Sequence, residues 1–413
     1  MTTDRLTWPR SDFSAAPYWF YTDAEIFGLE MERIFRGPTW NYLGLECEIR
    51  KPGDFLTCYV GTTPVVLSRS QDGGAHAFVN RCAHRGMQVV RELRGNQARH
   101  QCPYHHWCYN SSGELIGVPL LHGADGKGGL PQDFTLETHG LRKLRTATFC
   151  GVVFGTFVEN PPALEDYLGP AIVERMRYTL DRPLEVTGYH RHTIRANWKL
   201  FSENSRDAYH APLLHPFLPT FGLMRATDVG KSQVDRQGFH SLISVWSNVG
   251  DAAARRGKEG SRTLTLEDPS LVRGFQDYPD GLSLSIISAF PNALFTYVGN
   301  AHSVRQIRPK SPGVVDLLYT YFTFADDDAE KREVRRKQGN LFGPAGYVAM
   351  EDAEALELIQ AGIVRGEDRT FSTIEMGGRT IEDQDHVITE VSIRGFWKGY
   401  CGIMDVAGAG RAP

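Results

Sequence analysis

Two short segments of the chain each carry one cysteine and one histidine. The first segment carries Cys82 and His84, and the second carries Cys102 and His105. Thiolate and imidazole ligands suit zinc or an iron–sulfur cluster, whereas calcium and magnesium select oxygen ligands. A fold that brings these four side chains to one metal centre must hold two loops side by side on a rigid scaffold. This requirement constrains the chain more than any other feature of its sequence.

Two kinds of metal centre fit this set of ligands. A Rieske [2Fe–2S] cluster has two cysteines on one iron and two histidines on the other, which a pairwise split between two loops supplies. A structural zinc site uses the same side chains around a single tetrahedral ion. The four ligands alone leave both centres open.

The segments around these ligands predict a β-rich domain. Short runs of β-branched and aromatic residues, broken by Gly and Asp, are typical of strands joined by turns. The predicted strands cover residues 55–60, 64–68, 76–79 and 151–158. We therefore expect a metal-binding domain over residues 41–160, preceded by an N-terminal helical segment over residues 1–40.

A second domain is expected over residues 161–413, after Pro161 and Pro162. Residues 280–325 alternate between apolar and polar side chains and are interrupted by Pro, Asn and Gly, which predicts an antiparallel meander. Three consecutive aspartates at 326–328 precede a charged segment, and acidic residues favour the N-terminus of a helix. The predicted fold class is α+β, with an antiparallel sheet around long helices.

A second group of metal-ligand residues lies near the start of this domain. Glu203, Asp207 and His210 are spaced at i, i+4 and i+7, so a continuous helix would place them on one face. His215 follows after Pro212, which lacks the N–H that a regular helix needs, and a distortion there would bring both imidazoles to one ion. Two imidazoles and a carboxylate with open positions opposite are typical of non-haem Fe(II) oxygenases. A structural role for the two histidines is the alternative.

Both groups resemble motifs of one enzyme family. Residues 80–86 and 102–107 resemble the Rieske loops of aromatic-ring-hydroxylating oxygenases, and residues 203–215 resemble the iron-binding signature of the same family. The resemblance implies a β-rich Rieske domain and a helix-grip-like catalytic domain. It also implies a mononuclear non-haem Fe(II) on His210 and His215. The [2Fe–2S] cluster ligands that it implies are Cys82, His84, Cys102 and His105.

The carboxylate ligand of the mononuclear iron follows from the resemblance alone, because spacing cannot select it among 49 acidic residues. Residues 342–352 resemble the C-terminal segment of the family, whose iron ligand is the second acid of an acidic pair. The resemblance therefore implies Asp352 as the ligand. Glu351 is the alternative, since this chain has Glu-Asp where many relatives have Asp-Asp.

Asp207 matches a family aspartate that bonds to two histidines. One histidine binds the mononuclear iron, and the other binds the cluster of a neighbouring subunit. The resemblance thus implies that Asp207 links His210 to His105 of the next copy of the chain, fixes the imidazole and shortens the electron path. An acid on an exposed helix face is the alternative.

Three further segments resemble the large subunits that act on the aromatic carboxylates anthranilate, salicylate and terephthalate. They cover residues 40–46, 165–170 and 389–397. In that group two arginines are associated with the substrate carboxylate, and their positions match Arg305 and Arg394. Arginine binds a carboxylate through two parallel hydrogen bonds, although either residue could instead form a structural ion pair. Possible apolar walls of the pocket are Leu213, Leu214, Phe217, Phe221, Ile287 and Phe290.

The implied function is that of the large (alpha) subunit of a terminal dioxygenase. Such an enzyme inserts O₂ into an aromatic acid with electrons from a separate NAD(P)H-dependent reductase, directly or through a ferredoxin. Family members form homotrimers or α3β3 assemblies with a small beta subunit. A monooxygenase of the salicylate-hydroxylase type, a Rieske electron carrier and a zinc-stapled binding protein are the alternatives.

Composition and the N-terminal sequence limit the partners and the cellular location that we expect. A net charge of −4 gives no reason to expect nucleic acid or an anionic membrane as a partner. The N-terminus lacks a signal-peptide pattern, and the apolar runs are too short to span a membrane. Seven scattered cysteines do not make a disulfide framework. We expect a cytoplasmic enzyme.

Overall fold

The chain divides into two compact units. The smaller unit is Phe35–Tyr167, and the larger unit is Met1–Ile34 with Leu168–Pro413. None of the helices in the described residues is both long and apolar enough to cross a membrane. The computed structural model describes residues 6–247, 264–365 and 371–410.

The smaller unit is built from antiparallel strands. Its main sheet has the order β1-β10-β9-β4-β3-β2-β5, and β6, β7 and β8 form a second sheet. The predicted strands at 55–60, 64–68, 76–79 and 151–158 correspond to β2, β3, β4 and β10, which confirms the β-rich prediction. The strands are β1 (Asn41–Leu45), β2 (Asp54–Val60), β3 (Thr63–Arg69), β4 (Ala75–Val79), β5 (Arg94–Asn96), β6 (Arg99–Gln101), β7 (Cys108–Asn110), β8 (Leu115–Gly117), β9 (Lys143–Phe149) and β10 (Val152–Thr156).

The larger unit is organised around one antiparallel sheet of order β11-β17-β16-β15-β14-β13-β12. Strands β12 to β17 follow one another as a meander, as predicted for residues 280–325, and β11 pairs with β17 along its length. The strands are β11 (Leu184–Ile194), β12 (Val229–Val234), β13 (Ser241–Trp246), β14 (Leu282–Ala289), β15 (Ala293–Val298), β16 (Ala301–Ser311) and β17 (Val314–Phe324).

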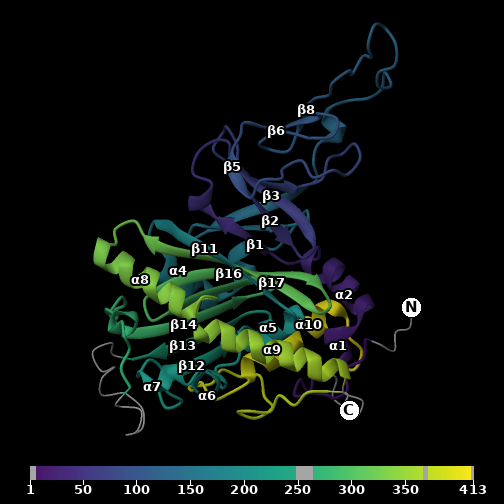
Figure 1. Ribbon diagram of the computed structural model, residues 1–413. Helices are drawn as coiled ribbons and strands as arrows, with labels where there is room; N and C mark the ends of the chain where they lie inside the picture. The colour runs from purple at the N-terminus through teal and green to yellow at the C-terminus, as the bar shows by residue number, and fades with distance from the viewer. Residues whose placement is uncertain (1–5, 248–263, 366–370, 411–413) are drawn as a thin grey trace. The chain divides into compact units, whose positions relative to one another are not determined.

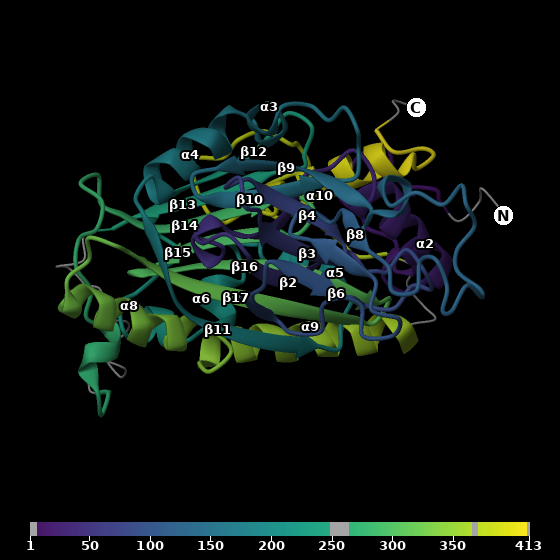
Figure 2. The ribbon, with the colours of Figure 1, turned by 90° about the horizontal axis from the view of Figure 1, so that it is seen from above.

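Two long helices, α8 and α9, lie end to end along this sheet, as both views show (Figures 1 and 2). The N-cap of α8 is Asp328, whose side chain accepts the backbone N–H of Lys331 at 2.8 Å, as the run of aspartates predicted. The helices of the chain are α1 (Trp19–Thr22), α2 (Ala24–Glu30), α3 (Leu164–Leu168), α4 (Pro170–Leu180), α5 (Trp198–Asn204), α6 (Ala211–Leu214), α7 (Phe217–Thr220), α8 (Ala329–Phe342), α9 (Tyr347–Arg365) and α10 (Val391–Met404).

A buried polar cluster joins α2, α5 and α10 within the larger unit. Glu30 accepts hydrogen bonds from Lys199 Nζ (2.5 Å), Trp198 Nε1 (2.7 Å) and Tyr400 OH (2.6 Å). The side chains of Glu30 and Lys199 are fully buried. A buried charge needs such partners because its desolvation is costly. The cluster therefore fixes α5 just before the segment that carries His210.

Candidate metal centres

The two loops of the smaller unit that carry the predicted cluster ligands have the same backbone structure. In each loop the cysteine N–H donates to the carbonyl five residues later, and the N–H four residues later donates to the cysteine carbonyl. Gly86 (φ 76°) and His106 (φ 58°) occupy equivalent left-handed positions. The bonds are Cys82–Met87 (2.8 Å), Gly86–Cys82 (3.0 Å), Cys102–Trp107 (2.9 Å) and His106–Cys102 (3.0 Å).

The four predicted ligands lie together, with sulfur on the inside and imidazole on the outside. Cys82 and Cys102 are buried in the core of the smaller unit. His84 and His105 are exposed, and their ring centroids are 4.6 Å apart. The Tyr109 hydroxyl lies 3.2 Å from Cys82 Sγ. A [2Fe–2S] cluster with one iron on each pair of ligands fits this separation of cysteines from histidines.

A single zinc ion does not fit the same residues. A tetrahedral zinc site holds its ligand atoms about 2.0–2.3 Å from one ion, and therefore within about 4.6 Å of one another. Among the described residues, the group of three ligand atoms within 4.8 Å of one another is that of His210, His215 and Asp352. The cysteine and histidine loops supply no such group, so their geometry favours the cluster over zinc.

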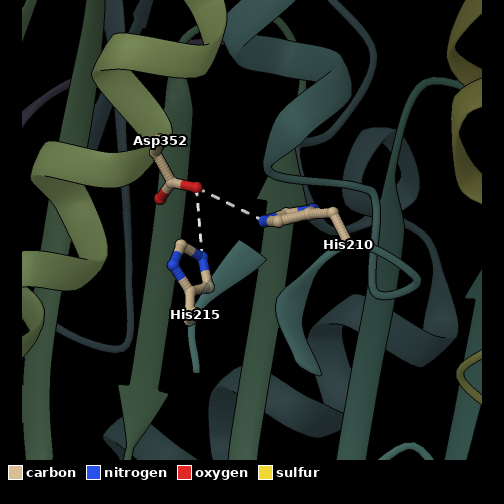
Figure 3. A group of neighbouring side chains, drawn as sticks. All are labelled: His210, His215 and Asp352. Carbon is tan, nitrogen blue, oxygen red and sulfur yellow. Dashed lines mark ion pairs between the residues drawn. The ribbon is translucent and has the colours of Figure 1, made fainter. Parts of the chain in front are cut away.

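His210, His215 and Asp352 converge in the larger unit (Figure 3). Asp352 Oδ1 lies 3.3 Å from His210 Nε2 and 3.2 Å from His215 Nε2. The histidines flank the short helix α6, and Asp352 comes from α9. Two imidazoles and one carboxylate on one side of a site are the ligand set of non-haem Fe(II) oxygenases, so the residues fit this metal.

The prediction of one continuous helix through Glu203, Asp207 and His210 was wrong. Helix α5 ends at Asn204, and Asp207 Oδ1 accepts the backbone N–H groups of Tyr209 (2.8 Å) and His210 (3.2 Å). A short acidic side chain that bonds to the backbone two and three residues ahead competes with the helix. This turn, rather than a helix face, aims His210 at Asp352.

Glu203 lies apart from the three ligand residues. Its Oε1 accepts hydrogen bonds from Tyr21 OH (2.5 Å) and Trp397 Nε1 (2.7 Å). Burial raises the pKa of Glu203 to about 7, although these bonds oppose the shift. Glu203 therefore supports the packing of α5 rather than the metal site.

Polar groups surround the three predicted ligand residues. Asp207 Oδ2 lies 3.3 Å from His210 Nδ1, and Asn204 Nδ2 donates to Asp352 Oδ1 at 3.1 Å. Burial lowers the pKa of His210, but the nearby carboxylates of Asp207 and Asp352 outweigh it and raise the pKa to about 10. The negative charge that holds a proton there also favours a metal cation. The hydrogen bond from Asn204 to Asp352 was not predicted. Asn204 lies within residues 203–215, which resemble the iron-binding signature, and this was the signal that could have identified it.

A cavity of about 100 Å³ opens from the three ligand residues into the sheet. Leu284 and Ile286 of β14 and Leu294, Thr296 and Val298 of β15 contribute to its wall. Each of these strands presents every second residue to the cavity, as the pleat of a strand requires. A neighbouring cavity of about 90 Å³ is also lined by Leu284 and Val298.

The predicted apolar walls were wrong. Leu213 is 65% exposed, and Ile287 has the opposite parity on β14 from Leu284 and Ile286. Among the described residues, the cavity is lined by none of the six that were predicted. For Ile287 the missing signal was strand parity, which decides which residues of β14 face the cavity.

The two predicted arginines lie in different places. Arg305 lines the cavity of the ligand residues, with its guanidinium 4.8 Å from the Tyr319 ring centroid. Arg394 is fully buried and donates to the backbone carbonyls of Thr380 (3.0 Å), Ile374 (3.2 Å) and Met376 (3.1 Å). The structure therefore brings Arg305, but not Arg394, to the lining of this cavity.

Two models of known protein families match this chain, one over each of the regions that contain a candidate metal centre. A family model described as a Rieske [2Fe-2S] domain matches residues 39–132, and one described as the ring hydroxylating alpha subunit (catalytic domain) matches residues 177–400. The second match covers more than half of the chain. The chain belongs to the ring-hydroxylating oxygenase alpha subunits.

Several curated alpha subunits match this one over nearly their whole length. It is 44% identical to the terephthalate 1,2-dioxygenase terminal oxygenase component subunit alpha 2 of Comamonas sp., with 96% of each chain covered. It is 43% identical to the anthranilate 1,2-dioxygenase large subunit of Burkholderia cepacia, over 96% of this chain and 95% of that one. The salicylate 5-hydroxylase large oxygenase component of Ralstonia sp. is 38% identical, with 96% of each chain covered.

The fold of this alpha subunit is shared with solved structures. Naphthalene 1,2-dioxygenase from Rhodococcus sp. superposes with a TM-score of 0.79 over 94% of each chain, at 24% identity. The predicted α+β fold with a Rieske and a catalytic domain is thereby confirmed. The alpha subunit is a Rieske non-haem iron oxidoreductase that uses a [2Fe–2S] cluster and a mononuclear iron. Family members are terminal oxygenases that work with a reductase and a ferredoxin.

Proposed function

We propose that this alpha subunit is the terminal component of a dioxygenase that hydroxylates the ring of an aromatic carboxylate. The Rieske domain is assigned to residues 41–160 and the catalytic domain to residues 161–413, after an N-terminal helical segment over residues 1–40. In this assignment the cluster ligands are Cys82, His84, Cys102 and His105. The ligands of the mononuclear Fe(II) are His210, His215 and Asp352.

Each residue of the catalytic site has a task under this proposal. When bound, the cluster would pass on single electrons and the mononuclear iron would supply the activation of O₂. Asp352 adds the negative charge, and the two Nε2 atoms are free to bind metal because their rings hold a proton at Nδ1. Asp207, whose Oδ2 lies 3.3 Å from His210 Nδ1, would orient that imidazole and link it to His105 of a neighbouring copy. Apolar side chains on β14 and β15 exclude water from the ring-binding space.

The position of Arg305 is the observation that supports an aromatic carboxylate as the substrate. It places a permanent positive charge in the same cavity as His210, His215 and Asp352, across a wall that is largely apolar on β14 and β15. A guanidinium binds a carboxylate through two parallel charge-assisted hydrogen bonds, which suits an aromatic acid as the substrate. The names of the relatives agree with a monocyclic acid.

Isotopic oxygen tests the reaction. The dithionite-reduced enzyme would be exposed to ¹⁸O₂ in a single turnover with terephthalate, anthranilate or salicylate, and the products would be analysed by mass spectrometry. Two labelled atoms in one product support dioxygenation. A single labelled hydroxyl supports the alternative of a monooxygenase, for which the salicylate 5-hydroxylase relative is the reason. Absence of product from all three acids and from their substituted analogues would contradict the proposed substrate class.

Replacement of Arg305 should weaken binding of the carboxylate selectively. We expect Arg305→Ala to raise KM for the preferred aromatic acid by about 10–100-fold, because charge-assisted hydrogen bonds contribute about 1.5–3 kcal/mol. Arg305→Lys keeps the charge but loses the planar fork, so its KM should lie between those of wild type and Arg305→Ala. Steady-state kinetics with a matched reductase measures the effect.

Two controls make this prediction specific. The carboxamide analogue of the same acid should bind equally to wild type and Arg305→Ala. Arg191→Ala removes an exposed positive charge that is bound to Asp316 on the sheet, and it should leave KM unchanged. A KM of Arg305→Ala within about twofold of wild type would show that this guanidinium does not hold a charge-assisted bond to the substrate.

We further propose the partners that the family pattern implies. Electrons come from an NAD(P)H-dependent reductase through a ferredoxin or directly. The chain assembles as a homotrimer or as α3β3 with a small beta subunit, since the Asp207 link needs a second copy. The seven cysteines all lie in the described residues and are free of disulfides, which suits a reducing cytoplasm.

A further inference from the structure

His215 is held between two acidic residues that are adjacent in the sequence. Its Nε2 lies 3.2 Å from Asp352 Oδ1, and its Nδ1 lies 2.7 Å from Glu351 Oε2. The imidazole is nearly buried, with 3% of its side chain exposed, and Glu351 is 26% exposed. Both nitrogens of the ring are therefore occupied, one towards the ligand group and one away from it.

Helix α9 makes this arrangement possible. Consecutive residues of an α-helix point about 100° apart, so Glu351 and Asp352 reach different sides of one ring. Glu351 is outside the convergent group of His210, His215 and Asp352, because its carboxylate meets the nitrogen that points away from that group. Its geometry is that of a hydrogen-bond acceptor to a metal-binding histidine rather than of a ligand.

From these contacts we propose that Glu351 is a positioning residue for the mononuclear iron site. Its carboxylate accepts the Nδ1–H of His215, fixes the tautomer that leaves Nε2 free for metal, and sets the orientation of the ring. The inference rests on the proposed ligand set of His210, His215 and Asp352, and it removes Glu351 from consideration as a ligand. A carboxylate in this position raises the basicity of a metal-bound imidazole and commonly changes metal affinity by about 10–100-fold.

Glu351 holds its histidine more directly than Asp207 holds His210. The Glu351–His215 contact is 2.7 Å, whereas the Asp207–His210 contact is 3.3 Å. One oxygen of Asp207 also accepts two backbone N–H groups, so its position is set by the turn as well as by the ring. Loss of Glu351 should therefore act chiefly on metal binding, whereas loss of Asp207 also disturbs the backbone.

Three variants separate positioning from ligation and from general charge effects. Glu351→Ala removes the acceptor and should weaken Fe(II) binding by about 10–100-fold. Glu351→Gln keeps the shape and one acceptor oxygen, so it should retain more affinity than the Ala variant. Glu354→Ala removes an exposed acid one turn further along α9, and it should bind Fe(II) as wild type does.

The experiment uses the whole enzyme with its cluster retained and its mononuclear iron removed by a chelator. Anaerobic Fe(II) titration gives the affinity, and electron paramagnetic resonance after addition of nitric oxide reports the geometry of the filled site. We expect Glu351→Ala at saturating Fe(II) to give a signal of altered rhombicity. Glu351→Gln should restore the wild-type signal at least in part. The absorption of the cluster checks that each variant is folded.

The outcomes distinguish this inference from the proposed function. Affinity of Glu351→Ala within about twofold of wild type, with an unchanged signal, would overturn the positioning role. Complete loss of iron from Glu351→Ala and Glu351→Gln alike, as a missing ligand would cause, would overturn it in favour of ligation. If wild type bound no Fe(II) beyond its cluster, the proposed iron site itself would fail, and the inference with it.

Discussion

Replacement of His210 by Ala is expected to abolish oxygenation while the cluster remains intact. A bound metal ion contributes several kcal/mol to a reaction, and each 1.36 kcal/mol is a factor of ten, so the rate should fall by at least about 10³-fold. His210 and His215 both face Asp352 Oδ1, and removal of one imidazole leaves too few ligands for the ion. Single-turnover product formation measures the loss of oxygenation, and analysis of the mononuclear iron content measures the loss of the metal.

The matched control is His122→Ala, which removes an exposed imidazole outside both centres. It should keep full activity and full iron content. His210→Ala should keep the visible absorption of the cluster and its reduction by dithionite. Product formation by His210→Ala at the wild-type rate would contradict the assignment. It would favour the electron carrier, which has no need of this histidine.

Replacement of Lys199 by Met is expected to lower the free energy of unfolding by about 3–5 kcal/mol, because it leaves the buried carboxylate of Glu30 without its counter-charge. Lys199 Nζ and Glu30 Oε1 are 2.5 Å apart, and both side chains are fully buried. Trp198 and Tyr400 still donate to Glu30, but neither carries a positive charge. Urea unfolding followed by far-ultraviolet circular dichroism measures the loss.

Two further variants establish the cause. The double variant Glu30→Met with Lys199→Met should lose less free energy than the sum of the single variants, because no unpaired charge remains. Lys231→Met, which removes an exposed lysine from β12, should change the free energy by less than about 0.5 kcal/mol. Additive losses in the double variant would show that the ion pair is not the source of the effect.

Local patterns predicted the parts of this fold that depend on few residues. Strands β2, β3, β4 and β10 follow from short runs of β-branched and aromatic residues, and the helix after Asp328 follows from its cap. The grouping of His210 with His215 was also predictable, because the two residues are close in sequence. These features need little information from distant parts of the chain.

Other features of the fold and the site depend on contacts between distant residues, which the sequence does not reveal. The end of α5 at Asn204 follows from the hydrogen bonds that Asp207 accepts from the backbone, which compete with a continued helix. The cavity walls follow from strand parity on β14, where a shift by one residue exchanges Ile286 for Ile287. The different locations of Arg305 and Arg394 required the packing of α10 against the sheet.

The central claim is that one chain carries a two-iron cluster and a separate mononuclear iron. Analysis of iron, acid-labile sulfide and zinc in anaerobically purified enzyme tests it most directly, together with electron paramagnetic resonance of the reduced protein. We expect about three irons and two sulfides per chain, with the low average g-value of a histidine-ligated cluster. Zinc in place of iron, with no visible colour, would contradict both centres.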